Sequence, residues 1–207
     1  MMNESERKSI RVDLQLIADM IRPGSRVLDI GCGNGALLDY LVHFKQVDGR
    51  GIEISTEGVN ACISAGLSVI QGDAEADIGN YPDQAFDYVI LSQTLQAMHR
   101  PDQMVEHLLR IGKQAVVSFP NFANWRHRLI LLLRGRMPVN ESLPFQWYET
   151  PNIHLCTIQD FVVLCRDLGV GIERSLSIGR NGKSRRIVGH SFLANLLDEQ
   201  AVFLLKK

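Results

Sequence analysis

The sequence lacks three features that would each point to a specialised class of protein. It has no run of eighteen apolar residues, which excludes an ordinary membrane-spanning helix. Its four cysteines form no C-x-x-C pair, a spacing typical of zinc and iron–sulfur sites. Its net charge of −1 gives no general attraction to nucleic acid or to anionic lipid. We therefore expect no metal, no nucleic-acid partner and no membrane partner.

The remaining composition is that of a globular protein. The 207 residues are 45% hydrophobic and 22% charged, which suits one domain over residues 1–207. The N-terminal stretch MMNESERKSI is polar and lacks the apolar core of a signal peptide. Together with the low cysteine count, this predicts a reduced, cytoplasmic setting. No internal repeat or low-complexity linker interrupts the chain.

Short apolar strands alternate with amphipathic segments along the chain. This alternation favours an α/β fold in which helices cover both faces of a mostly parallel sheet. Strands are expected at about 26–30, 49–54, 67–71, 86–92, 114–119, 171–178 and 201–205. Helices are expected at about 5–21, 35–44, 56–64, 101–111, 122–134, 157–169 and 187–197.

The stretch RVLDIGCGNG, residues 26–35, is an apolar strand followed by three glycines at alternate positions. Glycines there allow a sharp turn and a close approach to a ligand. Asp29 places a carboxylate beside the turn, which suits an ammonium group better than a phosphate. The pattern therefore favours S-adenosylmethionine (SAM). Gly31, Gly33 and Ala36 also fit the looser dinucleotide fingerprint, and a glycine turn without a ligand remains a third reading.

Three later strand ends carry groups suited to other parts of an adenosyl ligand. Glu53 follows Gly33 by twenty residues, the spacing of an acid that binds ribose hydroxyls, although it also reads as a surface carboxylate. Asp73 is suited to the adenine amino group and the Ala74 N–H to a ring nitrogen, but Asp73 alone reads equally as a helix cap. A buried fourth strand ends at Ser92–Gln93.

The strand ends together define the expected cofactor site. Cys32 is expected to contribute its backbone rather than a reactive thiol. The predicted cofactor-binding residues are Asp29, Gly31, Cys32, Gly33, Glu53, Ile54, Asp73, Ala74, Glu75, Ser92 and Gln93.

No catalytic residue can be assigned from the sequence. Methyl transfer needs positioning more than acid–base chemistry, and a base helps only when the acceptor carries a proton. His99, His154, Tyr148 and Glu149 are candidates, but none has a partner that the sequence can place, and a structural or exposed role is favoured for each. The fourth strand ends in LSQT, unlike the Asn/Asp-Pro-Pro-aromatic signature of enzymes that methylate exocyclic amines.

An inserted cover segment at about 120–156 departs from a minimal fold. It contains both tryptophans, Trp125 and Trp147, and a basic run from Arg126 to Arg136. A loop of this length without structure is unusual. The aromatics either pack over the open end of the sheet or form a lid or docking surface. A second basic cluster, at 180–186, reads as a solvated loop.

The motifs resemble those of the SAM-dependent methyltransferase superfamily. D-x-G-x-G-x-G at 29–35, the acid at Glu53, GDAE at 72–75 and FDYVILS at 86–92 carry the resemblance. The stretches from SQTLQAMHRP to LLLRGRMP and LPFQWYETPNIHLCTIQDF resemble the MetW family of methionine biosynthesis proteins. The resemblance implies a three-layer Rossmann-like fold with a seven-stranded sheet whose last strand is antiparallel, between the fifth and sixth strands.

The resemblance also implies a function, and it leaves two hypotheses open. In the first, the chain binds SAM or S-adenosylhomocysteine (SAH) and activates a homoserine O-acyltransferase of the α/β-hydrolase fold. In the second, it is itself a methyltransferase acting on a small carboxylate or hydroxyl acceptor. An NAD-dependent oxidoreductase is a weaker third reading, disfavoured by Asp29 and by the lack of a second domain.

Overall fold

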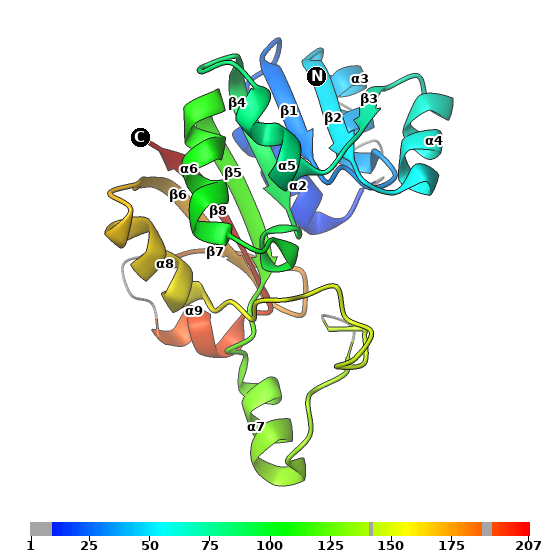
Figure 1. Ribbon diagram of the computed structural model, residues 1–207. Helices are drawn as coiled ribbons and strands as arrows, with labels where there is room; N and C mark the ends of the chain where they lie inside the picture. Colours follow the sequence, from blue (N-terminus) through cyan, green and yellow to red (C-terminus); the bar gives the residue numbers. More distant parts are fainter. Residues whose placement is uncertain (1–9, 141–142, 188–191) are drawn as a thin grey trace.

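The protein is a three-layer α/β/α structure, shown in Figure 1. The computed structural model describes residues 10–140, 143–187 and 192–207. The strands in this part of the chain are β1 Arg26–Ile30, β2 Asp48–Glu53, β3 Ser68–Gln71, β4 Phe86–Ser92, β5 Gly112–Pro120, β6 Gly171–Ile178, β7 Ser184–Arg186 and β8 Gln200–Lys206. The helices are α2 Val12–Met20, α3 Ala36–Lys45, α4 Thr56–Ser64, α5 Ala74–Asp77, η1 Ile78–Asn80, η2 Leu95–Ala97, α6 Pro101–Ile111, α7 Trp125–Arg134, α8 Ile158–Asp167 and α9 Phe192–Leu197.

The described strands form one mixed sheet in the order β3-β2-β1-β4-β5-β8-β6-β7. Neighbours from β3 to β5 are parallel, whereas β8 is antiparallel to both β5 and β6. The expected fold class and the antiparallel last strand between the fifth and sixth strands are thus confirmed. One detail differs, because the short edge strand β7 pairs with β6 and brings the strand count to eight.

The two faces of the sheet pack against different helices. Along β4, Val89 and Leu91 contribute to one core cluster, while Tyr88 and Ile90 contribute to the other. The first cluster includes side chains of α6 and α8, and the second includes side chains of α2 and α3. This alternation follows from the two-residue period of a strand. Both faces are therefore covered, which explains why the central strands are apolar throughout.

Most element boundaries agree with the sequence pattern to within a residue or two. α7 begins at Trp125 rather than near 122, because the Asn124 side chain accepts from the Arg126 N–H and caps the helix. The first predicted helix, at 5–21, is observed as α2 from Val12, so Ile10 and Arg11 are not helical. The predicted helix at 187–197 is observed only as α9. Residues 188–191 of that prediction and residues 5–9 of the first predicted helix lie outside the described residues.

The topology brings the predicted site residues to one edge. The carboxyl ends of parallel strands meet at the same side of a sheet, and β1, β2, β3 and β4 all end there. β5 is parallel to β4 and ends at this same edge, and α7, which follows β5, extends away from the body of the molecule on that side (Figure 1). No helix among the described residues is long and apolar enough to span a membrane.

Candidate functional site

The turn after β1 has the conformation that its glycines allow. Gly31 has φ +70°, and a Cβ there would lie 2.8 Å from Thr94 Oγ1. Gly35 has φ +79° and is the residue that precedes α3. Other residues adopt this left-handed conformation only with strain, so the glycines are required by the path of the backbone.

The N–H groups of this turn are bonded within the protein. Gly31 N and Cys32 N donate to Ile52 O, and Gly35 N donates to Cys32 O. Gly33 N donates to Glu53 Oε2 at 2.8 Å. A pyrophosphate group binds where such N–H groups are free to converge on it. The occupied donors, and the carboxylate of Asp29 nearby, make this turn a poor dinucleotide site.

Asp29, at the end of β1, is a buried carboxyl group without a complete set of partners. Its exposed fraction is 2%, and its Oδ1 accepts no hydrogen bond from the described residues. Burial, reinforced by the nearby charge of Glu53, raises the pKa of Asp29 to about 7. A cationic group placed beside Asp29 would stabilise its ionised form.

Gln93, at the end of β4, shows a second unsatisfied group. Its φ is +56°, in the left-handed region that a non-glycine residue seldom adopts. Gln93 N donates to Ser118 O at 2.9 Å, and Ser92 Oγ lies 3.1 Å from Ser118 Oγ. The buried Nε2 of Gln93 donates to none of the described residues. The backbone hydrogen bond to Ser118 therefore fixes Gln93 at the strand end, with its side-chain amide donor unpaired.

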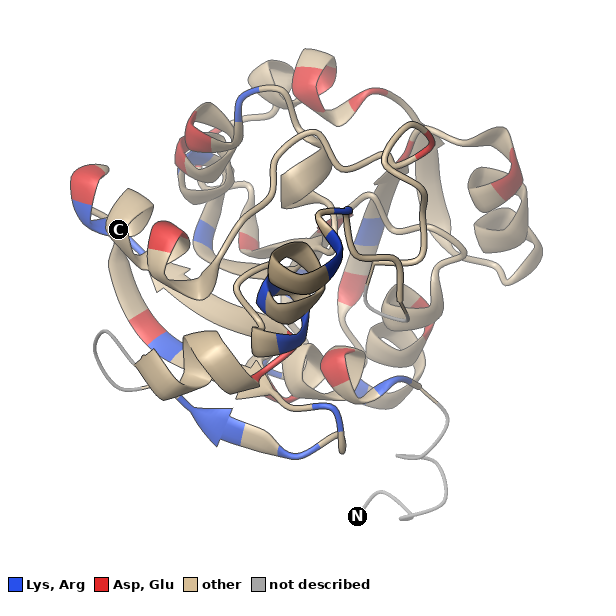
Figure 2. Cartoon of the chain, turned by 90° about the horizontal axis from the view of Figure 1, so that it is seen from below, with Lys and Arg blue, Asp and Glu red and all other residues tan. Residues whose placement is uncertain are grey.

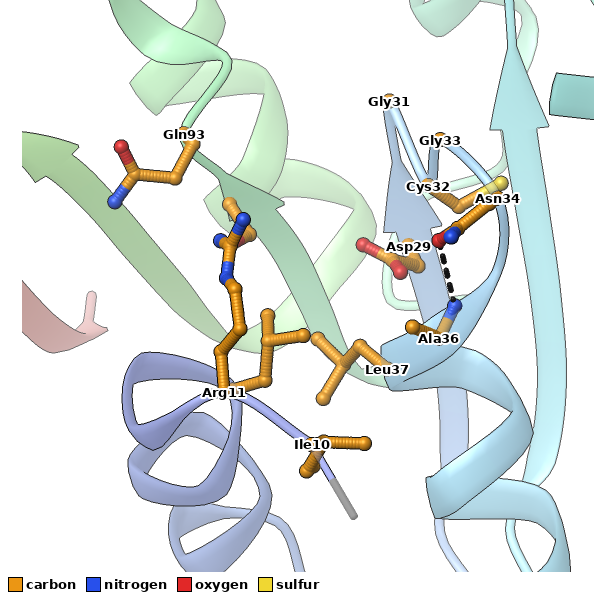
Figure 3. Close-up of a pocket in the computed structure, with 12 residues that line it drawn as sticks. Ile10, Arg11, Asp29, Gly31, Cys32, Gly33, Asn34, Ala36, Leu37 and Gln93 are labelled. Atoms are coloured by element: carbon orange, nitrogen blue, oxygen red, sulfur yellow. Dashed lines mark hydrogen bonds between the residues drawn. The ribbon is translucent and has the colours of Figure 1, made fainter. Parts of the chain in front are cut away.

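Asp29 and Gln93 line the same cleft, of about 390 Å³. Ile10, Leu14 and Leu37 form apolar walls of this cleft. Figure 3 shows Arg11 rising from the start of α2 toward the carboxyl ends of the strands. The cleft therefore combines an anionic group, a cationic group and an amide donor. This is a set of partners for an amino acid, whose ammonium and carboxylate need opposite charges.

Arg11 is a residue of the cleft that the sequence motifs did not predict. Its Nε and Nη2 donate to the Asp13 carboxylate at 3.1 and 2.7 Å, and Asp13 is buried. The bidentate contact fixes the guanidinium at the mouth of the cleft. The available signal was the Arg-x-Asp pair at the start of the first amphipathic helix, but only the packing of α2 against α3 places it near Asp29.

Glu53 lies at the end of β2, where the sequence placed it. Its Oε1 accepts from Ser55 N at 2.9 Å, and its Oε2 accepts from Gly33 N. A carboxylate has about four acceptor positions, so two backbone donors leave capacity for hydroxyl groups. The next residue, Ile54, is 67% exposed. Its bare apolar side chain would be covered by a flat ring bound beside β2.

Asp73 directly precedes α5, and Ala74 and Glu75 are its first two residues. Asp73 caps this helix by accepting from Glu75 N, the alternative reading of that residue. Glu75 accepts from His99 N, His99 Nδ1 and Arg100 N. Burial alone would raise the pKa of Glu75, but these hydrogen bonds outweigh it and hold the pKa below its usual value. In this structure Glu75 joins α5 to the start of α6, and cofactor contact by these three residues stays a prediction.

The candidate bases lie apart from Asp29. None of the four lines the cleft that holds Asp29 and Gln93. His154 Nε2 is 3.3 Å from His99 O, and His99 pairs with Glu75. Tyr148 and Glu149 are exposed. No group of three metal-ligating side chains occurs among the residues that the structure describes.

The thiol of Cys32 lies under the turn. Its Sγ is 3.9 Å from Cys62 Sγ, and Cys62 Sγ contacts Gly33 O at 3.4 Å. Burial, with Asp29 nearby, raises the pKa of Cys32 well above its usual value. A thiol that resists ionisation is a poor nucleophile, which supports a packing role for this side chain.

Comparison with known proteins identifies the family. Residues 11–205 match the family described as "Methionine biosynthesis protein MetW". The chain belongs to the MetW family. It is 35% identical over 177 residues to a bifunctional methionine biosynthesis protein MetXA/MetW from Rhodopirellula baltica, which covers 81% of this chain and 28% of that protein. The chain thus spans less than a third of that relative.

Two further matches concern the fold and the chemistry of relatives. A fatty-acid O-methyltransferase from Mycolicibacterium smegmatis is 32% identical over 114 residues, covering 53% of this chain and 41% of that protein. The crystal structure of a SAM-dependent methyltransferase from Archaeoglobus fulgidus matches with a TM-score of 0.68 at 17% identity, covering 97% of this chain and 94% of that one. This MetW protein therefore has the methyltransferase fold.

Proposed function

We propose that this MetW protein binds SAM or SAH at the carboxyl edge of β1–β4 and acts as a partner that activates a homoserine O-acyltransferase, the enzyme that forms O-acetyl- or O-succinylhomoserine. The two buried unpaired atoms in one cleft, Asp29 Oδ1 and Gln93 Nε2, carry the ligand half of the proposal. Buried polar atoms usually have partners, so two without them in one cleft indicate groups that a ligand satisfies.

The residues present fit the proposed ligand part by part. Asp29 faces the ammonium of the amino-acid tail, and Arg11 is placed for its carboxylate. Glu53 has acceptor capacity for the ribose hydroxyls, and Ile54 offers an apolar surface to the adenine. When bound, SAM would supply an activated methyl group, whereas SAH would supply none. The residues of this chain bind and orient the ligand in either case.

The MetXA/MetW relative supports the partner half of the proposal. The name of that relative joins MetXA and MetW in one polypeptide. The part that matches this chain is 28% of the relative's length. Fusion holds two proteins at a high effective concentration, which is favourable when they work as a complex. We infer that this chain and the acyltransferase make the corresponding contact as separate proteins.

Two measurements test the proposal. Titration calorimetry with SAM, SAH and NAD should show binding of the first two and none of NAD; binding of NAD alone would overturn the ligand assignment. Homoserine acylation by the purified acyltransferase should rise when this chain is added. An unchanged rate, with no complex detected by size-exclusion chromatography, would overturn the partner assignment.

A second candidate function is methyl transfer to a small carboxylate or hydroxyl acceptor. The observation that favours it is the match to a fatty-acid O-methyltransferase, a protein whose name describes an oxygen acceptor. Incubation of the chain with methyl-labelled SAM and a small-molecule extract should then label a product. Absence of label across extracts, together with SAH binding, would leave the partner function as the better account.

The cellular setting belongs to the same proposal. All four cysteines are free thiols, including the pair Cys32 and Cys62. Reduced thiols so close together suit a reducing compartment. We therefore place this activity in the cytoplasm.

A further inference from the structure

The helix α7 carries an apolar stripe that is half exposed at its start and largely exposed at its end. Trp125, Leu129, Leu132 and Leu133 follow the spacing i, i+4, i+7 and i+8, which places them on one face of a helix. Their exposed fractions are 42%, 42%, 80% and 72%. His127 lies on the opposite face and is only 2% exposed. The face of the helix that carries His127 therefore packs against the body, while Leu132 and Leu133 face outward.

The first turn of α7 is held firmly at its base. The Asn121 amide donates to Asn195 O and Asp198 O, both at 2.8 Å, and the Asn124 amide donates to Leu197 O at 3.0 Å. Asn121 and Asn124 are buried. These bonds join the start of α7 to the end of α9, which lies beside it in Figure 1. The exposed leucines are therefore presented by a fixed helix, a pre-organised arrangement that lowers the entropic cost of binding.

Charge distinguishes between the possible occupants of this stripe. Arg126 and Arg128 lie on either side of it, and Arg134 and Arg136 follow at its end. Residues 121–140 contain no Asp or Glu. Figure 2 shows α7 with Lys and Arg positions and no acidic position along it. The surface that covers the leucines must therefore be apolar in the middle and acidic at its sides.

A second copy of this chain does not satisfy that requirement. Two α7 helices packed stripe to stripe would bring the arginines of both copies to the same apolar seam, where like charges repel. A partner with carboxylates beside an apolar groove would pair with the arginines while burying the leucines. Helix-in-groove recognition uses anchors at this spacing.

We propose that α7 is the docking helix through which this chain binds the homoserine O-acyltransferase, and that the acyltransferase offers an apolar groove lined with acidic side chains. The inference rests on the proposed function for the identity of the partner, and it goes beyond that function by locating the interface. The anchors are Leu132 and Leu133, the two most exposed members of the stripe. Arg126 and Arg128 set the orientation of the helix in the groove.

The test measures binding of the full chain to the immobilised homoserine O-acyltransferase of the same genome by surface plasmon resonance. The double variant L132S/L133S should bind at least tenfold more weakly, since each buried leucine anchor of an interface contributes a substantial part of the affinity. The control I63S removes a similarly exposed side chain, 58% exposed, from α4 on the body. I63S should bind like the unaltered chain.

Charge reversal provides an independent arm. The variant R126E/R128E should slow association and remove most of its dependence on salt concentration, since rim charges act mainly on the association rate. All variants should keep their SAH affinity, because the substituted side chains are outside the cleft. L132S/L133S should also keep its thermal midpoint, since both leucines are largely exposed, whereas R126E/R128E removes the bond from Arg128 Nε to Ala123 O.

Three outcomes would decide against some part of this account, and they are distinguishable. If the unaltered chain does not bind the acyltransferase, the proposed function fails. If it binds and L132S/L133S binds equally well, the function stands and the docking helix is overturned. If sedimentation of the chain alone shows a dimer that L132S/L133S dissociates, the stripe is covered by a second copy, and the acyltransferase assignment of α7 is overturned.

Discussion

The carboxyl edge of the sheet and α7 both depart from the ordinary distribution of side chains, in opposite ways. In most of a folded protein polar side chains are exposed and large apolar side chains are buried. At the edge, the polar groups Asp29 and Gln93 are buried with unpaired atoms. On α7, apolar groups are exposed, up to 80% for Leu132. In each region the reversal is explained by something that binds there. An orphaned polar atom indicates a small polar ligand, and an exposed apolar stripe indicates a macromolecular surface.

The comparison also concerns stability. The interior around Phe161 is closely packed, with its ring 4.9 Å from that of Phe119 and 4.8 Å from that of Phe203. The outer half of α7 contacts little of the body. The exposed leucines at the outer end of α7 therefore add little to folding, whereas the stability of the fold depends on interior packing of this kind.

The largest expected effect comes from Phe161→Ala. Loss of this side chain, which is 1% exposed, should lower the free energy of unfolding by about 3–5 kcal/mol. Leu132→Ala should change it by less than about 0.5 kcal/mol, because that side chain is already in solvent. Urea denaturation followed by circular dichroism measures both. A large loss for Leu132→Ala would mean that α7 packs on the body, which contradicts the comparison.

The next effect concerns Glu53. Glu53→Ala should weaken SAH binding by roughly 2–3 kcal/mol, the scale of hydrogen bonds to a charged acceptor. Because Glu53 also holds Gly33 N and Ser55 N, the variant alone does not isolate the ribose contact. The control compares SAH with 2′-deoxy-SAH, which lacks one ribose hydroxyl. The unaltered protein should bind 2′-deoxy-SAH more weakly than SAH, and Glu53→Ala should reduce the affinity for 2′-deoxy-SAH by a smaller factor than the affinity for SAH. Equal losses for both ligands would contradict a ribose contact.

Asp29 should make ligand binding depend on pH. Its pKa of about 7 means that the carboxyl is mostly protonated at pH 6 and ionised at pH 8. SAH affinity measured by calorimetry should therefore rise by about tenfold between these values, since the ammonium binds the ionised form. Asp29→Asn should bind more weakly at pH 8 and give a flat profile. A flat profile for the unaltered protein would show that Asp29 does not face a cation.

The same pKa predicts a stability effect of known sign. The folded-state pKa of Asp29 lies above its usual value of 3.8, so the unfolded chain ionises first. The contribution of Asp29 to the stability of the ligand-free protein should fall as pH rises from about 4 to about 7, with no further loss from this group above that range. In Asp29→Asn this contribution should be absent. Thermal denaturation of both proteins between about pH 4 and about pH 7 would measure the difference.

Arg11 should distinguish ligands by their tail. Arg11→Gln should weaken SAH binding about tenfold, the scale of one charge-assisted hydrogen bond. It should leave 5′-methylthioadenosine, which lacks the amino-acid tail, unaffected. The control is Arg22→Gln, because Arg22 lies outside the cleft. Lys45 is not used, because it donates to Ala18 O in α2 and to Ile21 O at the end of that helix. Equal weakening of both ligands would assign Arg11 a structural role.

The smallest effect concerns communication between the two regions. Gln96 Nε2 donates to Gln93 O at 2.6 Å, and Gln96 O accepts from Ile153 N and His154 N, in the segment that follows α7. We expect SAH to change the affinity for the acyltransferase through this link, a coupling normally of a few kcal/mol or less. Gln96→Leu should reduce that change while keeping the SAH and acyltransferase affinities within about threefold. Binding assays with and without SAH test this; an unchanged coupling would exclude the Gln93–Gln96 link.

The sequence predicted the fold well because its signals are local. The turn glycines, the Pro101 start of α6 and the Thr157–Asp160 capping box of α8 each act within a few residues. The site was predicted in part. Asp29, Gln93 and Glu53 lie at the strand ends where the sequence predicts them, because parallel strands place their ends together, and their contact with a ligand stays a prediction. Arg11 was not found, because its position depends on the packing of α2 against α3.

The amino-acid sequence by itself determined which strands form, where they end and which chemical groups stand at those ends, since these depend on short-range patterns of burial and turn chemistry. Only the tertiary structure decided the outcome for groups whose partners are distant in the chain. In the folded chain Glu75 accepts hydrogen bonds from His99, Arg11 lines the same cleft as Asp29, and the leucines of α7 face solvent. The physical reason is that a local pattern shows that a helix has an apolar face, while the packing of the whole chain determines whether that face meets the core.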